Sequence, residues 1–357
     1  MDNNIKIINI RELEPGMILA KSILRNGKVL AYRNNPLKDS DIIRLIKEKI
    51  DDSVFIYENI VYSHKRPFTD NSLSNNVKIL NKTYNELSLT LNNIFYKLKM
   101  FQDSTITELR EFSNKIISKG NDTNSMLQSL ILNGSSNDPI YRHSINVALL
   151  SNLLGKWLNL HEEKLNLLTF SALLHDIGKT KIDEKIINKK TPLNFNEREK
   201  IAKHSILGYN IVKDIQFLDK SVYQGVLLHH ENEDGTGYPF KMTGDKITQF
   251  AKIIAIADSF DNFNSTRYGN IKINPFKSLE LLKEASFSTL DYCYTDVFIN
   301  NILNFFIGKD IILENGKKAQ LLMINVNSLD KPLINIDGEF IDLTIDKDID
   351  IKGFFLN

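Results

Sequence analysis

The sequence predicts a mainly α-helical protein with a small α+β domain at its N-terminus and a short β-rich appendage at its C-terminus. Between about residues 121 and 307, apolar residues recur at helical spacing, interrupted by turns such as Asn133-Gly134. Short β-forming stretches and hairpin turns such as Asn315-Gly316 lie outside this region. We therefore divide the 357 residues into an N-terminal domain (1–63), a linker with long helices (64–120), a central helical domain (121–307) and the appendage (308–357).

The N-terminal domain has the pattern of a small mixed fold. An apolar stretch at 5–10 is followed by the turn Pro15-Gly16 and by strand-like segments at 17–24 and 28–32. A short helix is expected near 40–50, and a further strand at 54–57. None of these residues forms a catalytic pattern.

The next segment predicts a long helix with one apolar seam. Its apolar residues follow alternating steps of three and four: Val77, Leu80, Tyr84, Leu87, Leu91, Ile94, Leu98 and Phe101. Such a seam needs a partner, and two interpretations stay open. The helix either packs along the central domain or forms a homodimer through residues 77–101, since just over three heptads is near the lower limit for a coiled coil.

Composition excludes several classes of protein. The 45 Lys and Arg residues balance 44 Asp and Glu, which leaves a net charge of +1 and argues against long nucleic acids as partners. No apolar run approaches the ~18 residues of a membrane-spanning helix, so no membrane insertion is expected. The single Cys293 forms no internal disulfide and no thiolate metal site. Because the start also lacks the profile of a secretion signal, we expect a cytoplasmic protein.

A set of histidines and carboxylates in the central domain predicts chemistry. Five of the seven histidines, His143, His175, His204, His229 and His230, lie in segments with helical periodicity, and His175 is followed directly by Asp176. A further aspartate, Asp258, directly follows the apolar run 253–257. A lone histidine on an apolar helix is usually a hydrogen-bonded core residue. Seven such groups on separate helices would each need a partner, whereas a shared cation satisfies them together. Nitrogen and oxygen ligands without sulfur suit Mn, Fe or Zn, and two ions about 3.5–4 Å apart suit phosphoryl displacement.

The motifs resemble those of the HD-GYP domains, a branch of the HD phosphohydrolase superfamily that degrades cyclic di-GMP. The resemblance runs from about residue 139 to 307 and implies an HD-type all-helical catalytic bundle. It is carried by Arg142-His143-Ser144, Leu174-His175-Asp176-Ile177-Gly178-Lys179, Lys203-His204, His229-His230-Glu231, Asp234-Gly235-Thr236-Gly237-Tyr238-Pro239 and Ala257-Asp258. The N-terminal domain is similar, through Leu13-Glu14-Pro15-Gly16-Met17, to a small β-rich domain that often precedes this family's catalytic domain.

The resemblance implies a site with two divalent ions that share a hydroxide. One ion would be held by His143, His175, Asp176 and Asp258, and the other by His204, His229 and His230, with Asp176 bridging the two. Fe or Mn is expected first, with Zn, Mg, Ni and Co as alternatives. Asp176 and Lys179 would be catalytic. The substrate contacts would be Lys179, Gly235, Gly237, Tyr238, Pro239 and Arg267.

The chain also departs from the family pattern in three places. Pro139 stands where some members have a glutamate that helps bind a third metal, so we predict two ions. The segment 266–270 keeps one arginine, Arg267, where the family commonly has two. Asn232-Glu233 replaces the common basic residue and tryptophan. The metal ligands are complete, whereas the contacts to substrate differ.

The sequence thus predicts a cyclic-guanylate-specific phosphodiesterase that hydrolyses cyclic di-GMP to linear pGpG, with continuation to GMP left open. One alternative keeps the metals and changes the substrate to another cyclic dinucleotide. A second alternative is a cyclic-dinucleotide receptor or signalling module with little turnover, acting through partner proteins.

Overall fold

The computed structural model describes residues 5–13, 17, 19–21, 23–25, 28–31, 37, 45, 53–57, 73–100, 102–119, 138, 140–215, 218–265, 275–325, 328–346 and 348–354. Contacts between Cα atoms divide the chain into two compact units, 1–70 and 71–357. The division into four segments made from the sequence remains a prediction.

The N-terminal unit is built from two antiparallel strand pairs. Strand β1 (Ile5–Asn9) pairs with β4 (Ser53–Tyr57), β2 (Ile23–Arg25) pairs with β3 (Lys28–Ala31), and the 3-10 helix η1 (Ile10–Glu12) follows β1. Alternation along β1 and β4 places Ile8, Val54 and Ile56 in one apolar core with Leu19. The expected short helix near 40–50 falls almost entirely outside the described residues.

Helices α2 (Leu73–Met100) and α3 (Gln102–Lys119) contact each other and α5. The seam predicted from the sequence faces inward: Tyr84, Leu87, Leu91, Ile94 and Leu98 are buried in the core of the second unit. The structure therefore favours packing within the chain over a dimer seam for these five side chains. The side chains of Val77 and Leu80, and Phe101, lie outside the described part.

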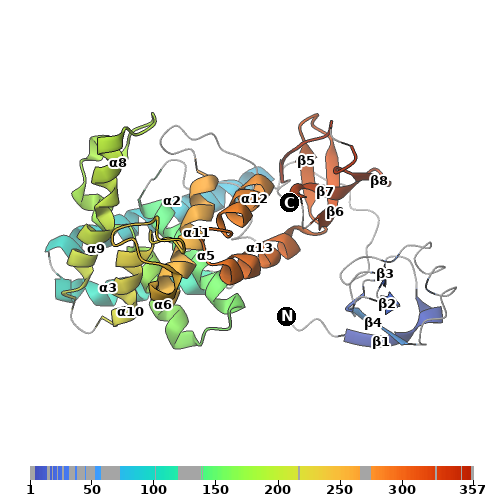
Figure 1. Ribbon diagram of the computed structural model, residues 1–357, viewed down its shortest axis with the longest axis horizontal. Coiled ribbons are helices and arrows are strands. Elements are labelled where there is room, and N and C mark those ends of the chain that lie inside the picture. Colours follow the sequence, from blue (N-terminus) through green and yellow to red (C-terminus); the bar gives the residue numbers. More distant parts are fainter. Residues whose placement is uncertain are drawn as a thin grey trace. The chain divides into compact units, whose positions relative to one another are not determined.

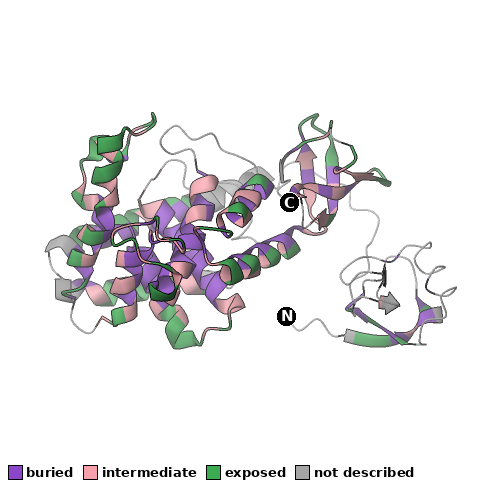
Figure 2. Cartoon of the chain, viewed as in Figure 1, coloured by how far each residue is buried: buried purple, intermediate pink, exposed green. Residues whose placement is uncertain are grey.

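The helical bundle continues from α5 to α13. Its centre is formed by α5, α6 and α11: α5 contacts both other helices, and α10 contacts α6 and α11. Figure 2 shows these central helices mostly buried and α8 mostly exposed. Residues 143–155 of α5 are all buried, as expected of a helix that is apolar on most of its faces. The bounds are α5 (Tyr141–Trp157), α6 (Glu162–Leu174), η2 (Ile177–Lys181), α7 (Glu184–Ile187), α8 (Phe195–Ala202), α9 (His204–Val212), α10 (Lys220–Leu228), η3 (Gly244–Lys246), α11 (Gln249–Phe263), α12 (Pro275–Ala285) and α13 (Tyr292–Phe306).

The chain ends in an antiparallel sheet with the strand order β8-β7-β6-β5-β9. Its strands are β5 (Asp310–Leu313), β6 (Lys318–Asn325), β7 (Ser328–Ile336), β8 (Glu339–Asp342) and β9 (Ile351–Phe354). Buried Leu321 and Ile334 belong to the same apolar cluster as Phe276 of α12 and Phe306 of α13, and β7 contacts α12 (Figure 1). The predicted mainly α fold with small β-rich ends is confirmed. Within the described chain, the helices are too short or too polar to cross a bilayer.

Candidate metal centre

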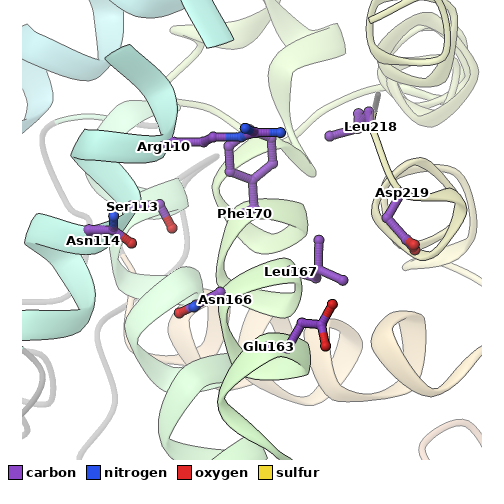
Figure 3. A pocket seen from close by; sticks show the side chains of 9 residues that line it. All are labelled: Arg110, Ser113, Asn114, Glu163, Asn166, Leu167, Phe170, Leu218 and Asp219. Carbon is purple, nitrogen blue, oxygen red and sulfur yellow. The ribbon is translucent and has the colours of Figure 1, made fainter. Parts of the chain in front are cut away.

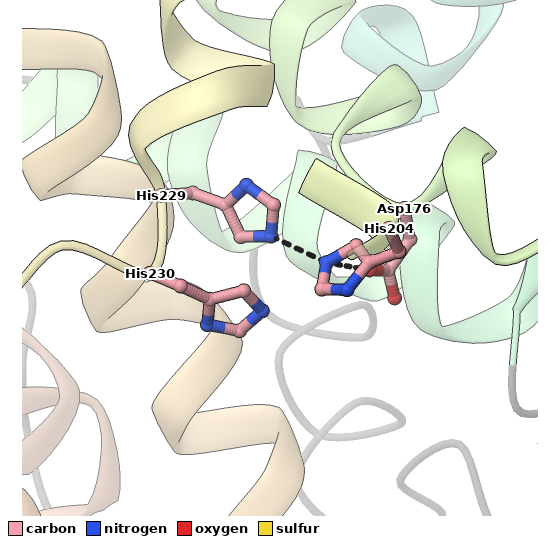
Figure 4. A group of neighbouring side chains, drawn as sticks. All are labelled: Asp176, His204, His229 and His230. Carbon is pink, nitrogen blue, oxygen red and sulfur yellow. Dashed lines mark hydrogen bonds and ion pairs between the residues drawn. The ribbon is translucent and has the colours of Figure 1, made fainter. Parts of the chain in front are cut away.

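Seven side chains from five helices and their ends come together in the bundle. They form two groups, and within each group one ligand atom per residue lies within 4.8 Å of the others. We call His143, His175 and Asp258 the first group. We call Asp176, His204, His229 and His230 the second group, and Figure 4 shows their side chains converging from different elements. The structure therefore brings together every metal ligand that the sequence predicted.

Asp176 lies between the two groups. Its Oδ1 is 3.2 Å from Nε2 of His204, whereas its Oδ2 is 3.4 Å from Nε2 of His143 and 3.5 Å from Nε2 of His175. Lys179 Nζ donates a hydrogen bond of 2.5 Å to Oδ2. Among the described residues, the buried Oδ1 has no hydrogen-bond donor. One carboxylate oxygen thus faces each group, which is the arrangement of a bridging ligand.

A glycine allows this position of Asp176. α6 ends at His175, and the chain turns through Asp176 into η2, which packs directly against α9. A Cβ atom on Gly178 would lie 1.9 Å from the main-chain oxygen of His204 and 2.5 Å from the main-chain nitrogen of Gly208. Only a residue without a Cβ permits this approach of η2 to α9, and the approach brings Asp176 to His204.

The orientation of the imidazoles is fixed by hydrogen bonds to the main chain. In three of them Nδ1 lies 2.6 to 2.8 Å from the carbonyl oxygen three residues earlier: His175, His204 and His229. A carbonyl oxygen only accepts, so Nδ1 carries the hydrogen and donates it. In a neutral ring Nε2 then presents a lone pair, and these atoms face the interior of the site.

Electrostatics leaves this interior short of positive charge. Burial lowers the pKa of His175 and His229 to about 4 and that of His204 to about 3, so these rings are neutral at pH 7. The Nε2 atoms of His204 and His229 are only 3.2 Å apart, so their lone pairs face each other. They lie beside Asp176 Oδ1, which has no hydrogen-bond donor among the described residues. Burial would raise the pKa of Asp176, but the ammonium of Lys179 holds it well below its usual value. The residues present fit a divalent cation with nitrogen and oxygen ligands.

Asp258 and His230 form the more open side of the site. Asp258 Oδ1 is 2.9 Å from His143 Nε2 and accepts a 2.8 Å hydrogen bond from Asn262 Nδ2. Asp258 Oδ2 is 4.0 Å from His230 Nδ1. The side chain of His230 is 23% exposed, more than any other of the seven, and its ring stacks on Tyr238 with centroids 4.6 Å apart.

The glycine-rich loop after α10 is held beside His230 by hydrogen bonds from its main chain to the side chain of Glu231. Buried Glu231 accepts hydrogen bonds from the main-chain nitrogens of Phe240 (2.6 Å) and Met242 (2.8 Å). Gly235 has a φ of +76°, and a Cβ on Gly237 would meet main-chain atoms at 2.4 Å. These two glycines therefore have a structural reason to be there. Substrate contact by Gly235, Gly237, Tyr238 and Pro239 stays a prediction, and Arg267 lies outside the described residues.

The sequence interpretation missed Asp261. This buried residue of α11 places Oδ2 2.7 Å from Nδ1 of His143, and its Oδ1 accepts a 2.7 Å hydrogen bond from Asn146 Nδ2. Its spacing of three residues from Asp258, in the same apolar helix, was the available indication.

A cavity of about 340 Å³ lies elsewhere in this unit. It is lined by residues of α3 and α6 together with Leu218 and Asp219, and Figure 3 shows its polar and apolar walls. None of the seven grouped side chains lines it, so it is separate from the candidate metal centre.

Comparisons with known proteins agree with this geometry. Residues 126–292 match the family model described as HD domain. The chain is 28% identical over 210 residues to "Cyclic di-GMP phosphodiesterase PA4108" of Pseudomonas aeruginosa, covering 59% of this chain and 50% of that one. It is 32% identical over 204 residues to "Cyclic di-GMP phosphodiesterase PdeB" of Borreliella burgdorferi, covering 56% and 53%. The chain thus matches about half the length of these curated relatives.

A solved structure supports the fold. The HDG"Y"P protein Bd1817 from Bdellovibrio bacteriovorus superposes with a TM-score of 0.52 at 17% identity, covering 84% of this chain and all of that one. The resemblance inferred from the motifs is confirmed at the level of the domain: the chain contains an HD domain over residues 126–292.

Proposed function

We propose that the chain is a metal-dependent phosphodiesterase that hydrolyses cyclic di-GMP to linear pGpG. The position of Asp176 carries the proposal, because one oxygen of this buried carboxylate faces each of two groups of nitrogen and oxygen ligands. Two relatives that are named cyclic di-GMP phosphodiesterases support the choice of substrate. Continuation to GMP is a question for product analysis.

The first group with Asp176 would hold one ion, and the rest of the second group would hold the other. Fe or Mn suits this set of imidazoles and carboxylates, with Zn, Mg, Ni or Co as alternatives. When bound, such a pair of ions supplies Lewis-acid stabilisation of charge on phosphate oxygens and a hydroxide nucleophile at neutral pH. The main-chain carbonyls that accept from His175, His204 and His229 keep the ligand atoms in place before any ion arrives.

The chain adds a positive charge of its own. Lys179 is buried, and its ammonium lies against Asp176 Oδ2, at the centre of the two groups. A lysine there can offset the charge that develops on the non-bridging oxygens of a phosphodiester. We propose Lys179 as the phosphate contact and Asp176 as the shared carboxylate.

Substrate would approach at the exposed edge of the site. His230 is the most accessible of the seven side chains, and Tyr238 stacks on it. We propose that Tyr238 and Pro239, with the loop glycines Gly235 and Gly237, form contact surface for the nucleotide, together with Arg267. With one cysteine in the chain, we also propose a cytoplasmic site of action.

Turnover tests the proposal. Purified protein supplied with Mn²⁺ or with Fe²⁺ under exclusion of oxygen should convert cyclic di-GMP to pGpG, measured by chromatography with mass detection. His175→Ala and Asp176→Ala should abolish conversion while circular dichroism shows a retained fold. His161→Ala is the matched control, since His161 is an exposed residue before α6 outside both groups. No conversion by the unsubstituted protein with either ion would overturn the proposal.

A second candidate keeps the metals and changes the substrate to another cyclic dinucleotide. It rests on the single arginine in the segment 266–270. Rates measured side by side with cyclic di-GMP, cyclic di-AMP and 3′3′-cyclic GMP-AMP distinguish the two. Binding of a dinucleotide without any product would instead identify a receptor.

A further inference from the structure

His143 differs from the other well-buried imidazoles of the site in its hydrogen-bond partner. His175, His204 and His229 donate to main-chain carbonyl oxygens, whereas Nδ1 of His143 lies 2.7 Å from the carboxylate of Asp261. A carboxylate carries a full negative charge, and a buried one acts through a low dielectric. An imidazole that donates to such a group is a more basic ligand at its other nitrogen.

Asp261 is also held in place by a second bond. Its other oxygen accepts a 2.7 Å hydrogen bond from Nδ2 of Asn146, which lies on α5 one turn after His143. The carboxylate therefore joins α11 to α5 at two points and is 2% exposed. Asp261 belongs to neither group of candidate ligands. Its effect on an ion would pass through His143.

We propose that Asp261 is a positioning residue that orients and polarises His143, and so makes the first group the tighter of the two ion sites. The inference rests on the proposed function only in that the two groups bind ions; it does not depend on the substrate. Loss of a carboxylate partner of a metal-bound histidine typically lowers metal affinity by about 10–100-fold. The same loss is expected here at the first group and not at the second.

Asn146 allows charge and geometry to be separated. D261N removes the charge, while its amide oxygen can still accept from His143 and the Asn146 amide can turn its oxygen towards the new amide nitrogen. Adding N146D returns one negative charge, now one hydrogen bond further from His143. Because the buried Oδ1 of Asn146 has no hydrogen-bond partner in the part of the chain that the structure describes, the exchange removes no acceptor contact seen there. The double variant should recover part of the lost affinity.

The experiment measures Mn²⁺ affinity of the chelator-treated full chain by competition with a fluorescent chelator. Two backgrounds isolate the groups: H204A impairs the second group and leaves the first, whereas H175A does the reverse. We expect D261N to weaken Mn²⁺ binding about 10–100-fold in the H204A background. In the H175A background the Mn²⁺ affinity should change by no more than about threefold, which is below that range.

A matched control separates positioning from loss of stability. Asn264 is the buried residue that follows the last residue of α11; it donates to the main-chain oxygen of Phe260 and accepts from Ser278. N264A removes buried hydrogen bonds at the C-terminal end of α11 that involve neither group, so it should lower the melting temperature without changing Mn²⁺ affinity in the H204A background.

Two outcomes would overturn the inference: equal Mn²⁺ affinity with and without D261N in the H204A background, or equal weakening in both backgrounds. Should D261N fail to fold, N146A takes its place. It loosens Asp261 and should weaken the first group alone by several-fold, and no change would refute the idea. Failure of the proposed function appears differently, as normal Mn²⁺ binding by the unsubstituted protein without cleavage of cyclic di-GMP.

Discussion

Substitution of Gly178 by alanine tests how the fold brings the two ligand groups together. The new Cβ would lie 1.9 Å from the main-chain oxygen of His204 and 2.5 Å from the main-chain nitrogen of Gly208. Ordinary van der Waals contact begins near 3.4 Å. Both neighbours are main-chain atoms, so no side-chain rotation relieves the clash, and η2 and α9 must separate by about 1.5 Å.

This displacement is large compared with the geometry of the site. Asp176 Oδ1 lies 3.2 Å from His204 Nε2, and an added 1.5 Å would take the two ligand atoms out of reach of one ion. We expect Gly178→Ala to lower stability by about 1–3 kcal/mol, the usual cost of overpacking. We also expect it to lower kcat/KM at least about 100-fold, as misplacements of about 1 Å do.

The assay combines Mn²⁺ stoichiometry, thermal unfolding and cyclic di-GMP turnover on one preparation. Gly155→Ala is the control, because the three atoms nearest to the Cβ it adds to α5 are side-chain atoms of Leu165, Leu168 and Leu160. The control should lose stability and keep both ions, whereas Gly178→Ala should lose an ion even well below its melting temperature. Full occupancy by two ions and normal turnover in Gly178→Ala would refute the reasoning.

Three further predictions concern pH, charge and the loop. Because burial lowers the pKa of His175, His204 and His229 to between about 3 and about 4, the unfolded chain takes up protons below pH 6.5 that the folded chain does not. Urea unfolding of the metal-free protein should therefore show stability falling from pH 6.5 towards pH 4, by up to about 4 kcal/mol per pH unit for three histidines; a flat profile between pH 7 and 5 contradicts the neutral rings. Lys179→Met should lower kcat/KM for cyclic di-GMP by about 100-fold, because a positive charge next to the phosphate is lost. Lys181→Met, at an exposed lysine, should leave kcat/KM unchanged. Equal effects of the two substitutions would contradict the proposed role of Lys179. Glu231→Gln should lower the free energy of unfolding by about 1–3 kcal/mol. It should also speed hydrogen exchange at the main-chain amides of Phe240 and Met242, which donate hydrogen bonds to Glu231. Unchanged exchange would show that another contact holds the loop.

The sequence was sufficient to predict which residues gather, because the ligands lie in short motifs at the ends of apolar helices. His175-Asp176 and His229-His230 end α6 and α10, where a polar side chain can face the interior while the helix before it packs. The mainly α fold with β-rich ends followed from periodicity. The proposed pairing of each ligand with a particular ion rests on the family resemblance.

Other features depend on tertiary contacts that spacing does not encode. Whether the α2 seam packs inside the chain or on a second copy depends on what lies opposite Leu87 and Leu91, and here α3 and α5 provide the partner. Asp261 is chemically similar to many surface aspartates in the sequence. Its spacing from Asp258 places it on the same helix, but its partners are known only from the fold, in which His143 and Asn146 of α5 lie opposite it.

Anomalous diffraction from crystals grown with Mn²⁺ tests the central claim most directly. Data collected on both sides of the manganese absorption edge should show two peaks, one at the first group and one at the second, with a different oxygen of Asp176 directed to each. A peak at neither group, or ions bound only elsewhere in the chain, would contradict the account.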